Sequence, residues 1–153
     1  MSVFRKLLSL CVAVLCVMSF TACSQSSSSA SSFPTDYGFS VQLPESVQEN
    51  IRYDLSNREV GGETINTINV VYEGETGEAN ILTFEEMSSA MWEQMQSEGG
   101  PLPTELGASE DGRVVVMYPL QSNPYEAGTA DADAVDLFVS ESSIVTESFQ
   151  FLQ

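Results

Sequence analysis

Hydrophobic and polar residues alternate along the first half of residues 33–153, which is the pattern of strands with one buried face. In YGFSVQLP the large apolar residues of 37–43 alternate with small or polar ones until Pro44. The pattern recurs at 51–55, 64–74 and 78–82, and glycine-rich residues 74–77 predict a turn. We therefore expect four strands before any helix, the last two forming an antiparallel hairpin.

The next segment carries the signals of a helix. Thr83 and Glu86 have the spacing of a capping box, and Gly99-Gly100-Pro101 is a stop signal. Between them an apolar stripe at i, i+4 and i+8 consists of Met87, Met91 and Met95, with Trp92 beside it. Methionines at this spacing could also bind a soft metal ion. Helical periodicity alone generates the spacing, however, and adaptable core packing is the simpler interpretation.

The second half predicts a hairpin and a long final helix. TELGASEDGRVVVMYPL should turn at Asp111-Gly112, and the unbroken apolar run 114–116 is typical of a central strand covered on both faces. After the loop QSNPYEAG, a helix from about Ala130 carries an apolar stripe of Ala134, Phe138, Val145, Phe149 and Leu152, widened by Leu137 and Ile144. The predicted fold is α+β, with four to six mainly antiparallel strands packed by two main helices.

The amino terminus has the organisation of a secretory signal. Two basic residues precede the uncharged segment 7–18, which is shorter than a membrane span. The following Phe20-Thr21-Ala22-Cys23 resembles the lipobox of bacterial lipoproteins. That resemblance implies cleavage before Cys23 and a diacylglyceryl group on its thiol. The alternative is an ordinary secretory signal cut after Ala22, which leaves a free thiol.

These features divide the chain into three parts. Residues 1–22 are expected to be the lipoprotein signal peptide, residues 23–32 the lipidated cysteine and a serine-rich tether, and residues 33–153 a single α+β domain. Two acyl chains would anchor the protein stably at the cell membrane without a spanning helix. The expected location is therefore extracytoplasmic.

The net charge and the missing residue types exclude several classes of function. Residues 23–153 contain three arginines against 22 acidic residues, a formal charge of −19, which disfavours binding to nucleic acid and to anionic headgroups. The chain has no histidine and residues 24–153 have no cysteine, which excludes histidine-dependent catalytic arrangements and histidine or thiolate metal sites there. We expect no cofactor and no enzymatic activity, since acid–base chemistry would rest on carboxylates or tyrosines alone.

Two segments resemble a known family. YGFSVQLPES at residues 37–46 and SSIVTESFQFL at 142–152 are similar to the opening strand and closing helix of PsbP-like domains, including those of short lipoproteins of Gram-positive bacteria. The resemblance implies a central antiparallel sheet flanked by helices, in a protein that acts as an accessory or binding subunit. It transfers no set of functional residues.

Acidic residues provide candidate cation sites. The spacing of Asp131, Asp133 and Asp136 is compatible with weak calcium binding. The alternative is structural, because carboxylates at the start of a helix interact favourably with the positive end of the helix dipole. The acidic pairs 85–86 and 110–111 are explained by a helix cap and a turn tip.

Aromatic and amide residues near the last loop provide the candidate recognition site. Tyr118, Asn123 and Tyr125 lie at a strand end and in the loop before the last helix. They are either partner-binding residues or parts of an ordinary connector.

The sequence thus favours a lipid-anchored, non-enzymatic accessory or binding domain of the bacterial cell envelope. Its expected partners are the membrane, through lipid on Cys23, and an envelope protein or small ligand that the sequence does not identify. The alternatives are a carboxylate-based extracellular hydrolase and a weak calcium-binding acidic module.

Overall fold

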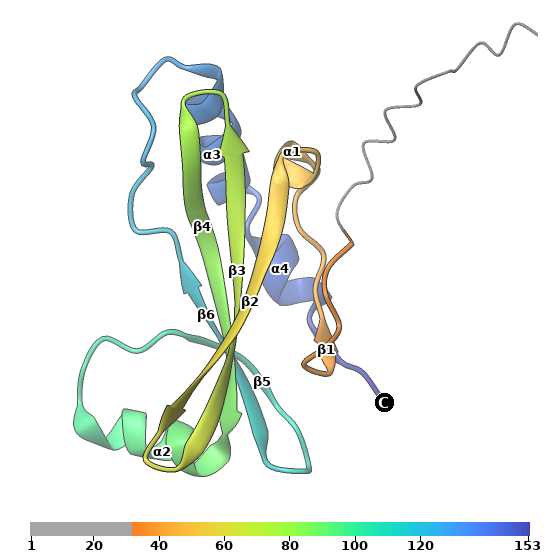
Figure 1. Cartoon of the computed structure of the whole chain (residues 1–153), viewed down its shortest axis with the longest axis vertical. Coiled ribbons are helices and arrows are strands. Elements are labelled where there is room, and N and C mark those ends of the chain that lie inside the picture. Colours follow the sequence, from red (N-terminus) through yellow and green to blue (C-terminus); the bar gives the residue numbers. More distant parts are fainter. Residues whose placement is uncertain (1–31) are drawn as a thin grey trace, which may run out of the picture.

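A five-stranded antiparallel sheet forms the centre of the protein (Figure 1). The computed structural model describes residues 32–153. In spatial order the strands are β2 (Ile51–Val60), β3 (Glu63–Gly74), β4 (Gly77–Ser88), β6 (Arg113–Pro119) and β5 (Thr104–Ala108). A second, two-stranded sheet pairs β1 (Phe39–Ser40) with β7 (Gln150–Phe151). The predicted α+β class and mainly antiparallel sheet are confirmed.

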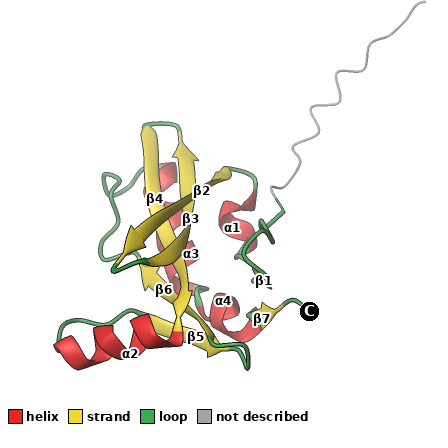
Figure 2. Ribbon diagram, turned by 60° about the horizontal axis from the view of Figure 1, so that its bottom comes forward, coloured by secondary structure: helices red, strands yellow, loops and turns green. Residues whose placement is uncertain are grey.

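Helices pack on both faces of the central sheet. Figures 1 and 2 show α2 (Ser89–Glu98) at one end of the sheet, apart from α1 (Glu45–Gln48), α3 (Ala130–Ser140) and α4 (Ser143–Ser148). The larger core joins one sheet face to α3, α4 and the amino-terminal segment, and it includes Ile68, Val70, Phe84, Val115, Val135, Phe138 and Val145. The smaller core joins α2 to the opposite face and contains Ile65, Met87, Met91, Trp92, Val114 and Val116. None of the helices in residues 32–153 is long and apolar enough to cross a membrane.

The predicted start of the first long helix is wrong. Residues 83–88 belong to β4, and the helix begins after Ser88, whose Oγ accepts a hydrogen bond from Met91 N at 3.1 Å. β4 is hydrogen-bonded to β3 on one side and to β6 on the other, and this pairing overrides the local capping signal of Thr83 and Glu86. The methionine stripe is therefore divided between a strand and a helix, although Met87 and Met91 are still buried in one cluster.

The predicted long final helix is interrupted. It divides into α3 and α4, with residues 141–142 between them, and ends in β7, which pairs Phe151 with Phe39. At the break, Ser140 Oγ donates to Leu137 O at 2.7 Å and Ser142 Oγ to Val139 O at 2.8 Å. The backbone at the break also uses short-range bonds, from Ile144 N to Glu141 O and from Val145 N to Ser142 O at 3.1 Å each.

In the amino-terminal segment, the alternating pattern predicts correctly which residues are buried, but it does not predict how many residues pair in a strand. Phe39, Val41 and Leu43 are buried as expected, although only two residues join a ladder and the single-turn α1 follows. In β2, Ile51 is buried but Leu55 is 41% exposed. Because β2 is an edge strand, its second half extends beyond the core.

Candidate functional site

Polar side chains gather on the sheet face that carries α2. Residues directly opposite in an antiparallel ladder project from the same face, so the register groups side chains from four strands. One row consists of Asp54, Asn69, Thr83 and Tyr118, and the next of Ser56, Thr67, Glu85 and Val116. We call the polar members of these rows, with Arg58 and Asn80, the polar face.

Amide and hydroxyl groups on the polar face form a small network. Thr83 Oγ1 donates to Asn69 Oδ1 at 2.8 Å, and Asn80 Nδ2 donates to Thr83 Oγ1 at 2.8 Å. The three side chains are exposed or half-buried and hold one another in place across β3 and β4. The network therefore presents preorganised, uncharged polar groups to solvent.

Beside this network lies a buried carboxylate with two partners. Arg58 contacts both oxygens of Glu85 through its two terminal nitrogens, and Tyr118 Oη donates to Glu85 Oε2 at 3.1 Å. The hydrogen bond to Glu85 raises the pKa of Arg58. Burial, followed by the Glu85 charge, raises the pKa of Tyr118 to about 12, so the phenol stays protonated at neutral pH and acts as a donor.

A shallow pocket adjoins the polar face where β6 runs into the loop that follows it. It has a volume of about 310 Å³ and is lined by Asn80, Ile81, Leu82, Thr83, Tyr118, Pro119, Leu120, Gln121 and Ser122. Tyr118 thus connects Glu85 with the pocket wall. Hydroxyl, amide and apolar groups in one hollow favour a small, uncharged polar ligand.

The acidic pair 85–86 does not form a carboxylate dyad. Adjacent residues of a strand point to opposite faces, so Glu86 lies on the side of α3 and α4. There Asn66 Nδ2 donates to Glu86 Oε2 at 2.7 Å, and Glu86 is 8% exposed. The predicted capping role of both glutamates is wrong, since neither lies at a helix start.

Asn123 and Tyr125 hold the loop before α3 against the rest of the fold. Asn123 Nδ2 donates to Ala132 O at 2.9 Å and to Asp136 Oδ1 at 2.8 Å, and Tyr125 Oη donates to Gly77 O at 2.8 Å. Of the three predicted recognition residues, only Tyr118 lines the pocket of the polar face. The other two have contacts that explain them as connector residues.

The three aspartates of α3 have separate environments. Asp131 is buried and accepts hydrogen bonds from Glu75 N and Thr76 N at 3.0 Å each, which fixes the β3–β4 turn to α3. Asp136 accepts from Asn123, and Asp133 is exposed. Within residues 32–153, no three acidic side chains converge to hold a metal ion.

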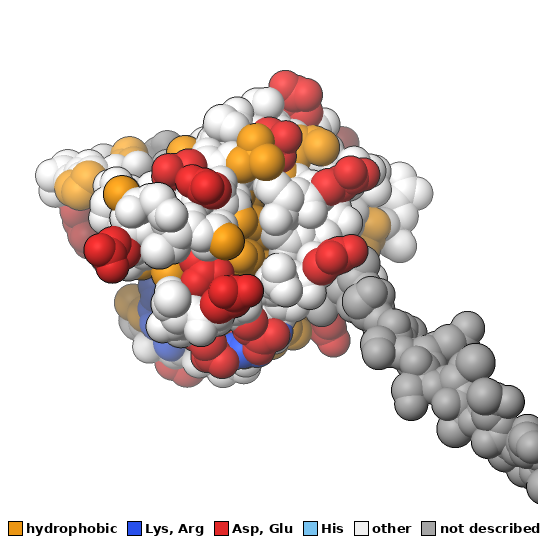
Figure 3. Space-filling view, turned by 90° about the horizontal axis from the view of Figure 1, so that it is seen from above, with side chains coloured by type: hydrophobic (Ala, Val, Ile, Leu, Met, Phe, Trp, Pro, Cys, Tyr) orange, Lys and Arg blue, Asp and Glu red, His pale blue; other side chains and the backbone are white. Residues whose placement is uncertain are grey.

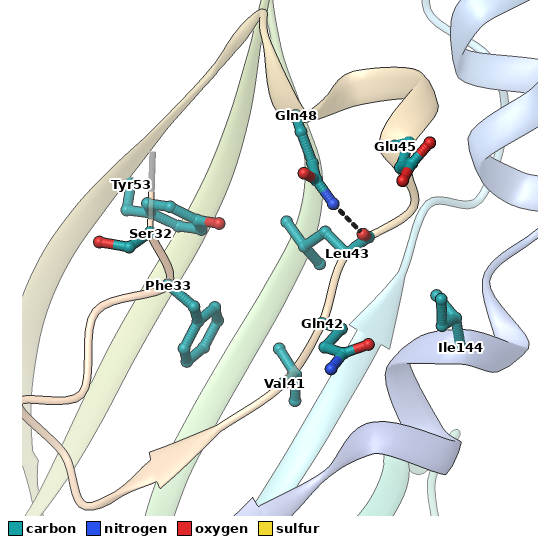
Figure 4. A pocket seen from close by; sticks show the side chains of 9 residues that line it. All are labelled: Ser32, Phe33, Val41, Gln42, Leu43, Glu45, Gln48, Tyr53 and Ile144. Carbon is teal, nitrogen blue, oxygen red and sulfur yellow. Dashed lines mark hydrogen bonds between the residues drawn. The ribbon is translucent and has the colours of Figure 1, made fainter. Parts of the chain in front are cut away.

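A second pocket lies between the amino-terminal segment and β2 (Figure 4). It has a volume of about 280 Å³, with apolar Phe33, Val41, Leu43, Tyr53 and Ile144 and polar Ser32, Gln42, Glu45 and Gln48. Gln48 Nε2 donates to Leu43 O at 2.6 Å, which fixes the amide to the backbone beside the pocket. The pocket lies where the chain enters the domain.

Cys23 and the predicted signal peptide lie outside the described residues. Comparison with known proteins finds no matching family model, curated protein or solved structure. The functional interpretation therefore rests on the sequence and on the geometry of the described part.

Proposed function

We propose that this chain is a lipid-anchored, non-enzymatic binding domain of the bacterial cell envelope. The observation that carries the proposal is the position of Cys23, which follows an apolar segment and Phe20-Thr21-Ala22 and directly precedes a serine-rich stretch. Lipid on this thiol holds the protein at the membrane, and the domain is displayed on the extracytoplasmic side.

The beginning of the described fold is consistent with a tether that ends at Ser32. Phe33 packs against Phe39, Tyr53 and Phe84, with ring centroids 5.4–5.5 Å apart. The first apolar residue after the serine-rich stretch is therefore already part of the core. Ser24–Ser32 would separate the domain from the headgroups by roughly 15–18 Å if flexible.

The side chains of the polar face suit ligand binding better than they suit catalysis. On the polar face Glu85 is occupied by Arg58 and Tyr118 and Asp54 is paired with Arg52, whereas Glu86 faces the other side of the sheet. A hydrolase of the carboxylate type needs two carboxyl groups facing one cleft, about 5–10 Å apart. The preorganised amides and hydroxyls beside the Tyr118 pocket suit recognition of an uncharged polar group of the envelope.

Fractionation of producing cells tests the anchor. The wild-type protein is expected in the membrane fraction, whereas Cys23→Ala should accumulate as the uncleaved precursor or appear in the medium. Ser24→Ala is the matched control, because it alters the neighbouring residue and keeps the thiol. Wild-type protein in the medium, or a Cys23→Ala protein that is cleaved and retained in the membrane fraction like the wild type, would contradict the proposal.

A further inference from the structure

A groove with an apolar floor and an acidic rim lies between α1, α3 and α4. It has a volume of about 650 Å³. Its apolar lining is Pro44, Leu137 and Ile144, and its acidic lining is Glu45, Glu141 and Glu147. We call this hollow the acidic groove. It is separate from the polar face, because α3 and α4 cover the opposite side of the sheet.

Two aliphatic side chains that line the acidic groove are exposed to solvent. Leu137 is 48% exposed and Ile144 is 36% exposed, whereas their neighbours Phe138 and Val145 are buried in the core. The two residues widen the apolar stripe beyond what the domain itself buries. Exposed aliphatic side chains beside acidic ones are complementary to a partner that carries both apolar and basic side chains.

The rim of the groove carries unneutralised negative charge. Glu141 Oε2 accepts a hydrogen bond from Ser46 Oγ at 3.3 Å, and no basic residue lines the groove. Figure 3, which looks down from the top of Figure 1, shows acidic side chains spread over this end of the molecule with hydrophobic side chains between them. The three arginines of the described part pair with carboxylates elsewhere, namely Arg52 with Asp54, Glu73 and Glu78, Arg58 with Glu85, and Arg113 with Asp111.

This combination specifies the chemistry of the occupant. Aliphatic side chains of a partner would cover Leu137 and Ile144, while flanking lysines or arginines would meet the glutamates on the rim. An anionic membrane surface has the wrong charge for this groove. We propose that the acidic groove binds a basic amphipathic segment of a partner protein, and this inference depends neither on the polar face nor on lipid at Cys23.

Fluorescence polarisation with a designed peptide tests the inference. The probe is a fluorescein-labelled helical peptide with leucines at i, i+4 and i+7 and lysines between them. It is titrated with the mature protein recovered from producing cells, held in phosphatidylcholine nanodiscs if the protein carries lipid and in plain buffer if it does not. Binding should weaken in about 0.5 M NaCl, where charges are screened. It should be lost when the leucines are replaced by serine or the lysines by glutamate.

Variants locate the binding site. Leu137→Ser should weaken binding on the order of tenfold, because one aliphatic anchor is lost. The double variant Glu141→Gln/Glu147→Gln should weaken it by roughly threefold to tenfold and reduce its salt dependence. Both changes lie on the surface, and circular dichroism verifies that each variant is folded.

Matched controls are available at the other end of the molecule. Leu102, in the segment between α2 and β5, is 46% exposed, and Glu110 lies in the exposed β5–β6 turn. Leu102→Ser and Glu110→Gln should leave the affinity unchanged. The proposal is overturned if the wild-type protein does not bind the peptide more tightly than empty nanodiscs or buffer do. It is also overturned if the glutamate-substituted peptide binds equally well, or if groove and control variants behave alike.

Discussion

The Arg58–Glu85 pair allows a stability prediction to be worked from the structure. The Glu85 side chain is 7% exposed and that of Arg58 is 50% exposed. Removing one partner of a fully buried ion pair costs about 3–5 kcal/mol, whereas an exposed pair contributes at most about 1 kcal/mol. Because Arg58 is half exposed, we expect Arg58→Met to lower the free energy of unfolding by an intermediate amount, about 2 kcal/mol.

A double-mutant cycle separates the pair from the packing of each side chain. Glu85→Gln keeps an acceptor for Tyr118 and leaves Arg58 to solvent, so its expected cost is about 1 kcal/mol. The double variant Arg58→Met/Glu85→Gln no longer buries an unpaired charge. It should therefore lower the free energy of unfolding by about 1 kcal/mol less than the sum of the two single changes. Arg52→Met, which removes an arginine with exposed carboxylate partners, is the control and should cost less than Arg58→Met.

Urea denaturation followed by tryptophan fluorescence measures these changes. Trp92 is the only tryptophan of the chain and is buried beside Met91 in the smaller core, so its emission reports loss of the core. The dependence of the unfolding free energy on urea should stay constant among the variants. Full additivity, or an Arg58→Met protein within about 0.3 kcal/mol of the wild type, would refute the reasoning.

Two further changes test the connections of the loop and turns around α3. Tyr125→Phe removes the hydrogen bond to Gly77 O and should lower the unfolding free energy by about 1 kcal/mol in chemical denaturation; an unchanged value would contradict a connector role. For Asp131, burial raises the pKa, but hydrogen bonds from Thr76 and Glu75 outweigh it and lower the pKa below 3.8 overall. The wild type should therefore exceed Asp131→Asn in stability at neutral pH, and this advantage should shrink as pH falls below about 3.8, as measured by denaturation at pH 7 and at about pH 3; an advantage of the same size at both pH values would contradict the assignment.

The sequence predicts those elements whose pattern directly reflects burial. The uninterrupted run Val114–Val116 predicts a strand covered on both faces, and these residues are 0–2% exposed in β6. The glycine-rich stop after residue 98 is also confirmed, since Gly99 ends α2 in the left-handed conformation with φ of 68°. In both cases the signal and its physical cause lie in the same short segment.

Predictions fail where distant residues decide the local structure. Thr83–Ser88 carries a helix-start pattern, yet pairing with β3 and β6 holds it in a strand. The sequence also gives no sign that the Tyr125 hydroxyl donates to Gly77 O, 48 residues away. The pairing of Arg58 with Glu85 spans 27 residues and carries no sequence signal of its own.

The two proposed surfaces differ in how far the sequence reveals them. Tyr118 is identified from its place at a strand end, whereas Asn69 and Thr83 join it only through the register of three strands. The acidic groove spans the interruption of the last helix, with exposed Leu137 in α3 and exposed Ile144 in α4. The sequence pattern predicts an unbroken helix that buries both residues in its apolar stripe.

Mass spectrometry of the mature amino terminus tests the central claim most directly. Protein isolated from membranes should begin at Cys23 and carry a diacylglyceryl group on the thiol. The corresponding peptide from Ser24→Ala protein should show the same modification. An unmodified Cys23, or a mature chain that begins at another residue, would contradict the account and identify the protein as one held in the envelope by other means or secreted.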